Sequence, residues 1–151
     1  MLKVGDTIPP VTVLDENGKP FSTTSIRGKW VLYFYPQDMT ETCTVQACNL
    51  RDNFDELAKK RIAVVGISPD GIASHQKFKS KHTLPYSLLS DPDHKIINAF
   101  GVWGEKQMFG RKYLGLLRTT FLIEKGIIKK IITKPKSAQH AKEIFEAWNI
   151  T

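Results

Sequence analysis

The sequence predicts an α/β fold, in which a central sheet mixes parallel and antiparallel strands and carries helices on both faces. Residues 30–35 are continuously apolar, and residues 61–68 are apolar between Arg61 and Ser68, as in strands that helices bury on both faces. Segments with a helical period alternate with these runs, and an antiparallel hairpin is predicted near the C-terminus. The chain has 151 residues, 41% hydrophobic and 25% charged, which fits a single domain over residues 1–151.

The chain is expected to begin with a hairpin and a buried strand. A short strand at 11–14 precedes Asn17–Gly18, a dipeptide that favours positive φ in tight hairpin turns. A helical turn is expected at 22–27. The apolar run 30–35 forms the first buried strand, and Pro36 ends it.

Residues 41–60 have the period of an amphipathic helix. The stripe expected to face the core consists of Cys43, Ala47, Leu50, Phe54, Leu57 and Ala58. Charged side chains occupy the opposite side. Cys43 is therefore expected in the first helical turn, on the buried side and near the preceding strand.

Strand and helix alternate again in the middle of the chain. Residues 61–68 form the second buried strand, and the Ser-Pro-Asp segment 68–70 caps a helix that runs to about Lys81. Residues 85–89 connect this helix to a short capped helix that ends at Phe100. The alternation predicts parallel crossover connections within the sheet.

The C-terminal third contains the predicted hairpin and the last helix. Segments 117–123 and 127–133 form the two strands, joined by a Glu-Lys-Gly turn. Ser137 begins the final helix, whose inward-facing residues are expected to be Ala141, Ile144, Phe145 and Trp148. This order of elements suits a thioredoxin-like fold as one of several open α/β folds.

Cys43 is the strongest candidate for chemistry. A thiol in the first turn of a helix faces unpaired backbone N–H groups and the positive end of the helix dipole, which favour the reactive thiolate. Cys48 is the only other cysteine of the chain. The pattern therefore predicts redox chemistry, and the alternative is that Cys43 is a small core side chain, as cysteines often are.

The spacing of Cys43 and Cys48 constrains any disulfide between them. On a straight helix, residues five apart differ by about 7.5 Å in rise and about 140° in azimuth, which places their Cα atoms about 8–9 Å apart. A disulfide requires Cα atoms within about 7 Å. A bond between the two cysteines would therefore require the helix to unwind locally.

Composition limits the classes of partner and the compartment. No signal peptide or membrane span is expected, so the protein is predicted to be cytoplasmic, where a cysteine pair is more often catalytic or metal-binding than structural. The net charge is +7, but the lysines are spread and no arginine-rich arm is present. A solvated surface is therefore favoured over specific nucleic-acid binding.

No cofactor or metal is expected. The histidines show no metal-ligand spacing with one another or with the cysteines, so surface or capping roles are predicted for His75, His82, His94 and His140. No glycine-rich phosphate loop or dinucleotide-binding motif occurs.

Motifs along nearly the whole chain carry a resemblance to a known family. Pro36, Thr40 and Cys43 stand in the spacing Pro-x-x-x-Thr-x-x-Cys, which matches the peroxidatic motif of the peroxiredoxins. Further matching segments are 33–36, 43–48, 50–52, 64–68, 88–91, 101–106 and 118–123. Together they resemble the atypical two-cysteine branch called PrxQ, or bacterioferritin comigratory protein.

The resemblance implies a thiol-dependent peroxidase that reduces hydrogen peroxide and organic hydroperoxides. Cys43 would be the peroxidatic nucleophile and become a sulfenic acid. Thr40 would offer its hydroxyl to the thiolate and the peroxide, Arg118 would stabilise the thiolate, and Pro36 would shield it. Cys48 would resolve the sulfenic acid as an intramolecular disulfide. Thioredoxin or a glutaredoxin would reduce that disulfide, and a monomer is expected.

Plainer interpretations remain for individual residues. Thr40 alone could be a helix N-cap, Arg118 a charge at a strand edge, and Cys48 a surface thiol. Relatives usually have Gly where this chain has Thr42, and commonly Glu where it has Gln46. For the whole protein, the alternatives are a dithiol-disulfide oxidoreductase acting on protein disulfides and a basic, non-enzymatic binding module.

Overall fold

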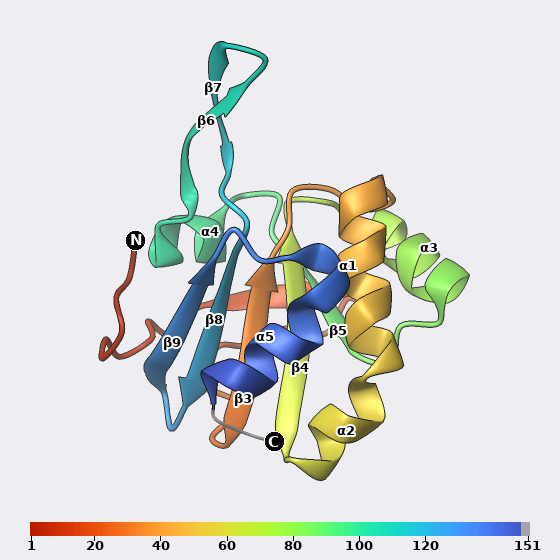
Figure 1. The fold of residues 1–151 in the computed structure, drawn as a ribbon, viewed down its shortest axis with the longest axis vertical. Helices are drawn as coiled ribbons and strands as arrows, with labels where there is room; N and C mark the ends of the chain where they lie inside the picture. The colour runs from red at the N-terminus through yellow and green to blue at the C-terminus, as the bar shows by residue number, and fades with distance from the viewer. Residues whose placement is uncertain (149–151) are drawn as a thin grey trace.

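The centre of the molecule is a seven-stranded mixed sheet, seen in a computed structural model that describes residues 1–148 (Figure 1). Its strands are β1 (Thr12–Asp15), β2 (Pro20–Ser22), β3 (Lys29–Phe34), β4 (Ile62–Ser68), β5 (Ser87–Ser90), β8 (Thr119–Glu124) and β9 (Ile127–Thr133). They lie in the order β2-β1-β5-β4-β3-β8-β9. β3 pairs in parallel with β4 and antiparallel with β8, which confirms the predicted mixture of pairings.

Helices cover both faces of this sheet, as predicted. They are α1 (Glu41–Asp52), α2 (Phe54–Lys59), α3 (Ile72–His82), α4 (Lys95–Phe100) and α5 (His140–Ala147). Trp30, Leu32 and Phe34 of β3 pack in one core with residues of α4. Val31 and Tyr33 point the other way and pack with residues of α1, α3 and α5. All five side chains are buried, which explains why β3 is apolar at every position after Lys29.

The predicted helix over 41–60 is two helices. α1 ends at Asp52 and α2 begins at Phe54, because Asn53 between them leaves the helical conformation with φ −107° and ψ 11°. The Asn53 side chain donates to the carbonyl of Asn49 over 2.8 Å, a local bond that competes with the helical pattern. Ala58, predicted to face the core, is exposed beyond this break.

Other boundaries also differ from the prediction. α3 begins at Ile72 rather than after the cap at 68–70, because the carboxylate of Asp70 accepts hydrogen bonds from Ser68 and from the backbone of Asp38. Residues 22–27 contain turns and no helix, and residues 87–90 form strand β5 instead of a simple connection. A short 3-10 helix, Ser137–Gln139, precedes α5.

A second sheet of two strands projects from the body of the molecule (Figure 1). β6 (Trp103–Met108) and β7 (Arg111–Leu116) pair antiparallel around a turn at Phe109 and Gly110, both with positive φ. The sequence pattern does not predict this hairpin, because the first four residues of β7 are exposed and no hydrophobic alternation marks the strand. Its base adjoins the site described below.

Among residues 1–148, no helix combines the length and apolar character that crossing a membrane would require.

Candidate active site

Cys43 lies at the start of α1, as predicted. Its side chain is 1% exposed and belongs to the core cluster that also contains Tyr33 and Tyr35. α1 extends from Glu41 to Asp52, so its unpaired N-terminal N–H groups place partial positive charge near this thiol. Cys43 thus combines the burial of a core residue with the electrostatic environment of a reactive one.

Arg118 contacts the sulfur of Cys43 directly. Its Nη2 donates a hydrogen bond to Sγ over 3.0 Å, and its Nη1 donates to Oε1 of Gln46 over 3.3 Å. The two residues are 75 positions apart in sequence. The pairing of Phe34 in β3 with Thr119 in β8 brings them together. A guanidinium at this distance stabilises negative charge on sulfur, so the pair can support a thiolate nucleophile.

Gln46, which lies in α1 like Cys43, binds the guanidinium of Arg118. Its side chain is fully buried, its Oε1 accepts from Arg118, and its Nε2 has no hydrogen-bond partner within the described part of the chain. The sequence marks Gln46 only as a departure from the usual Glu. The signal for its role is its spacing, because a residue three positions after Cys43 shares that face of a helix.

Thr40 and Pro36 line an open cavity at the same end of the sheet. The cavity has a volume of about 600 Å³. Its lining residues are Pro36, Gln37, Thr40, Glu41, Thr42, Pro69, Trp103, Lys106, Gln107, Tyr113, Gly115, Leu116 and Arg118. Thr40 occupies the N-cap position without capping α1, since its hydroxyl donates instead to the carbonyl of Gln37 over 3.3 Å. The structure therefore brings Pro36, Thr40 and Arg118 to one cavity.

Cys48 lies on α1, and neither it nor the buried Cys43 is among the residues that line that cavity. Cys48 is half-buried, and both cysteines are free thiols. α1 is continuous from one cysteine to the other. Their pairing in a disulfide therefore still depends on the predicted unwinding.

A buried network that sequence reasoning missed holds the loop between β3 and α1. Asp38 of this loop accepts hydrogen bonds from Tyr35 (2.6 Å), Ser74 (2.8 Å) and His75 Nδ1 (2.7 Å). His75 Nε2 bonds the carbonyl of Leu89 over 2.8 Å. Both ring nitrogens face acceptors, so both carry protons and His75 forms a buried ion pair with Asp38. Burial lowers the pKa of His75, but the hydrogen bond to Asp38, the charges of Asp38 and Asp70 and the carbonyl of Leu89 together raise it more, for a net increase.

Asp70 extends this network to the ends of β4 and β5. Its Oδ2 accepts from Ser68 and from the backbone of Asp38, each over 2.7 Å. Oxygen and nitrogen atoms of Asp38, Asp70 and His75 lie within 4.8 Å of one another, a spacing that metal ligands can have. All three side chains are already hydrogen-bonded to protein groups, so the arrangement fits a structural network better than an ion site.

The surface or capping roles predicted for the histidines are wrong for two of them. His75 and His140 are both fully buried. His140 bonds Thr120 through Nε2 over 2.9 Å and Glu143 through Nδ1 over 3.1 Å. Helical periodicity identifies a buried face but does not reveal a polar partner from another element, which is why these sites escape sequence patterns.

The stability of the protein is expected to fall at acidic pH through His140. Burial lowers the pKa of His140, although Glu143 partly opposes this, so the unfolded state binds more protons below its ordinary pKa. The contribution of His140 is then fully present above about pH 6.5 and falls with a slope of at most about 1.4 kcal/mol per pH unit. Urea denaturation should show that the stability deficit of His140→Gln at about pH 7.5 shrinks at about pH 5. An equal deficit at both pH values would contradict this.

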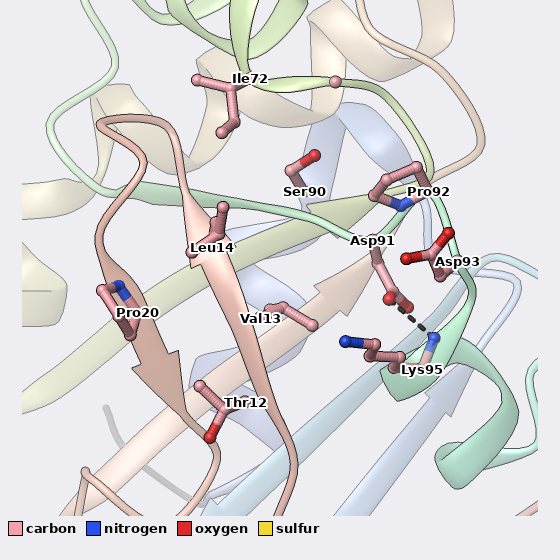
Figure 2. Close-up of a pocket in the computed structure, with 11 residues that line it drawn as sticks. Thr12, Val13, Leu14, Pro20, Ile72, Ser90, Asp91, Pro92, Asp93 and Lys95 are labelled. Carbon is pink, nitrogen blue, oxygen red and sulfur yellow. Dashed lines mark hydrogen bonds between the residues drawn. The ribbon is translucent and has the colours of Figure 1, made fainter.

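A separate cavity of about 420 Å³ lies between the β1–β2 hairpin and the loop before α4 (Figure 2). None of the five predicted site residues lines it. Its most buried acidic side chain, Asp91, accepts hydrogen bonds from the backbone N–H groups of Lys95 (2.7 Å) and Ile97 (2.9 Å). Asp91 therefore caps α4, whereas Pro36, Thr40 and Arg118 all line the other cavity.

Known proteins resemble this chain in both sequence and structure. The AhpC/TSA family model matches residues 4–131. Peroxiredoxin Bcp of Escherichia coli (strain K12) is 45% identical over 141 residues, or 92% of this chain and 90% of that protein. Peroxidoxin BcpB from Mycobacterium tuberculosis has a TM-score of 0.87 and 31% identity, over 99% of this chain and 97% of its own.

A second solved structure is the bacterioferritin comigratory protein of Xanthomonas campestris, studied for its alkyl peroxide reduction activity. It has a TM-score of 0.86 and 28% identity, over 95% of this chain and 98% of its own. These likenesses confirm the thioredoxin-like fold and extend over nearly the whole chain. The chain therefore belongs to the AhpC/TSA family, and it is a thiol-dependent peroxidase of the PrxQ or Bcp type of peroxiredoxin.

Proposed function

We propose that Cys43 is the peroxidatic nucleophile of this enzyme. Its thiolate attacks one peroxide oxygen, the O–O bond breaks, and the sulfur becomes a sulfenic acid while the other oxygen leaves as water or an alcohol. The observation that carries this proposal is the 3.0 Å hydrogen bond from Arg118 Nη2 to Sγ at the start of α1. The same guanidinium can stabilise the charge that develops on the departing oxygen.

Thr40 and Pro36 have supporting roles in the proposal. The Thr40 hydroxyl lines the cavity beside Arg118 and has one weak backbone partner, so it can turn toward the thiolate and the peroxide. Pro36 is half-buried at the cavity wall, where its ring excludes water from the sulfur. Trp103 and Leu116 add apolar surface. This lining supports organic hydroperoxides as substrates in addition to hydrogen peroxide.

Cys48 completes the proposed cycle as the resolving residue. Its thiol attacks the sulfenic acid of Cys43, which forms a disulfide and releases water. The turn of α1 that carries Cys48 is anchored, because Tyr86 donates to the carbonyl of Ala47 over 2.9 Å and Asn49 bonds the start of α5. The unwinding is therefore expected in the first turns of α1, so that Cys43 moves toward Cys48.

The proposal also includes the reductant of the enzyme, its compartment, its oligomeric state and the role of its surface charge. Thioredoxin or a glutaredoxin is the proposed reductant of the disulfide, in a cytoplasmic compartment that keeps such donors reduced. An intramolecular resolving cysteine lets a monomer complete the cycle, and residues 1–151 are proposed to act as a single domain. The +7 charge is assigned to a solvated surface that attracts acidic partners.

Intact mass after one equivalent of hydrogen peroxide tests this cycle. The reduced protein should lose two hydrogens and retain no thiol that can be alkylated. Cys48→Ser should still oxidise rapidly but stop at an added oxygen, and Cys43→Ser should not react. A disulfide-linked dimer, or a wild-type product that keeps the added oxygen, would remove Cys48 as the internal resolver. An unchanged wild-type mass would contradict the role of Cys43.

A further inference from the structure

Lys106 is held in a defined position at the base of the projecting hairpin. It lies in β6 opposite Tyr113 of β7, and its Nζ is 5.9 Å from the centroid of the Tyr113 ring. Its aliphatic stem lies over Gly115, where an added Cβ would come within 3.1 Å of Lys106 Cδ. The glycine thus leaves room for the lysine stem, and the aromatic ring favours the nearby ammonium.

Lys106 lines the same cavity as Arg118, whose guanidinium donates a hydrogen bond to the sulfur of Cys43. Lys106 and Arg118 line both the 600 Å³ cavity and a neighbouring one of about 740 Å³, so they lie where the two meet. Lys106 forms no ion pair with a carboxylate within residues 1–148, whereas the adjacent Glu105 pairs with Lys112 at 3.6 Å. Lys106 therefore adds an uncompensated cationic group beside Arg118.

Burial and neighbouring charges both change the pKa of the Lys106 ammonium. Burial lowers the pKa of Lys106, the positive charge of Arg118 lowers it further, and the charge of Cys43 opposes the decrease. Ammonium, guanidinium and thiolate are thus close enough to interact electrostatically. A lysine whose pKa is lowered gives up its proton more readily, which is the property of a general acid.

The proposed peroxidase reaction requires such a proton. Attack by a thiolate releases hydroxide or an alkoxide, and both are strong bases that leave far more easily once they are protonated. A guanidinium stabilises this charge but remains protonated in proteins, and a threonine hydroxyl is a weak acid. Lys106 is a cavity-lining group that carries both a positive charge and a proton it can transfer.

We propose that Lys106 is a catalytic residue, which protonates the leaving oxygen of the peroxide as Cys43 attacks. The S–O bond forms and the O–O bond breaks. The leaving oxygen takes a proton from the Lys106 ammonium to become water or an alcohol, and solvent then returns a proton to the amine. This inference rests on the proposed role of Cys43 and adds the source of the proton.

The test compares two peroxides that differ in their leaving groups. Rapid-quench mass measurements would give the rate of Cys43 oxidation by hydrogen peroxide and by peracetic acid, whose leaving acetate needs no proton. For Lys106→Met, we expect a decrease of about 100-fold with hydrogen peroxide, the scale of general acid catalysis, and little change with peracetic acid. Lys106→Arg should be as slow as Lys106→Met with hydrogen peroxide, because it keeps the charge but not a transferable proton.

The matched control is Lys112→Met, which removes one positive charge from the exposed face of the same hairpin. It should react with both peroxides like the wild type. Equal slowing of Lys106→Met with both peroxides would indicate a structural role and overturn the proposal. Full activity in Lys106→Arg would overturn it too, because charge alone would then suffice. If wild-type Cys43 reacts with neither peroxide, the proposed role of Cys43 itself fails, which is a distinguishable result.

Discussion

Arg118→Ala is expected to slow the oxidation of Cys43 by hydrogen peroxide by about 10²–10³-fold, the usual cost of removing one donor that stabilises developing charge. The substitution removes the hydrogen bond to Sγ and the bond to Gln46 together. The sulfur then loses its cationic partner, and the departing oxygen loses the same guanidinium. Rapid-quench mass measurements of the reduced protein would follow the first oxidation without any contribution from the reductant.

Two further variants separate charge from geometry in this prediction. Arg118→Lys keeps a cation but cannot bond Sγ and Gln46 with one planar fork, so an intermediate rate is expected. Arg111→Ala, at an exposed position of β7, should oxidise at the wild-type rate. If Arg118→Ala retained near-normal peroxide reactivity with an intact fold, the arginine would have no part in the reaction.

Asp38→Ala is expected to cause the largest loss of stability, about 3–5 kcal/mol in the free energy of unfolding, because it breaks a buried ion pair and leaves one charge without its partner. Asp38 is the common acceptor of Tyr35, Ser74 and His75. Removing its carboxylate leaves two buried donors, Tyr35 and His75, and the half-buried Ser74 without this acceptor. Urea denaturation followed by far-UV circular dichroism would measure the change.

Two control variants accompany this prediction: a conservative substitution of Asp38 itself and the removal of a distant, exposed carboxylate. Asp38→Asn keeps an oxygen acceptor but loses the charge, so it should restore part of the stability. Asp93→Ala removes an exposed carboxylate near α4 and should alter stability by less than about 0.5 kcal/mol. A loss for Asp38→Ala no greater than that for Asp93→Ala would show that the buried pair contributes nothing net to folding.

The loop position of Asp38 links this stability to the site. The network attaches the segment between β3 and α1 to β4, α3 and β5, and this segment carries Thr40 and leads directly to Cys43. The unwinding of α1 that we propose requires that the preceding segment be held in place. The ion pair of Asp38 with His75 holds this segment within the loop, just before the start of α1.

Sequence patterns predicted the strands and helices in which the burial of the side chains follows one regular pattern. Residues 30–35 and most of 61–68 are apolar because β3 and β4 are buried at nearly every position, and this composition is visible without any knowledge of partners. The sequence also places Cys43 at the start of a helix, because the apolar strand ends at Pro36 and the helical period begins at residue 41. Arg118 was predicted as a site residue because the segment 118–123 resembles the peroxiredoxins.

Features set by side-chain partners could not be predicted in this way. The break at Asn53 depends on one side-chain bond to a helical carbonyl, and the late start of α3 depends on where the Asp70 carboxylate finds donors. The β6–β7 hairpin has no buried face over most of β7, so it leaves no hydrophobic alternation to detect. The roles of Gln46 and Lys106 depend on Arg118, which comes from another element.

The sequence by itself determined the α/β fold class, the buried strands and the helix start that carries Cys43, because hydrophobic periodicity and backbone preferences act over a few residues. Only the tertiary structure decided which groups meet at the sulfur and in the buried network. Arg118 reaches Cys43 across 75 positions of chain, and His75 reaches Asp38 across 37. Such contacts depend on strand register and helix packing, which arise when distant segments bury their surfaces together.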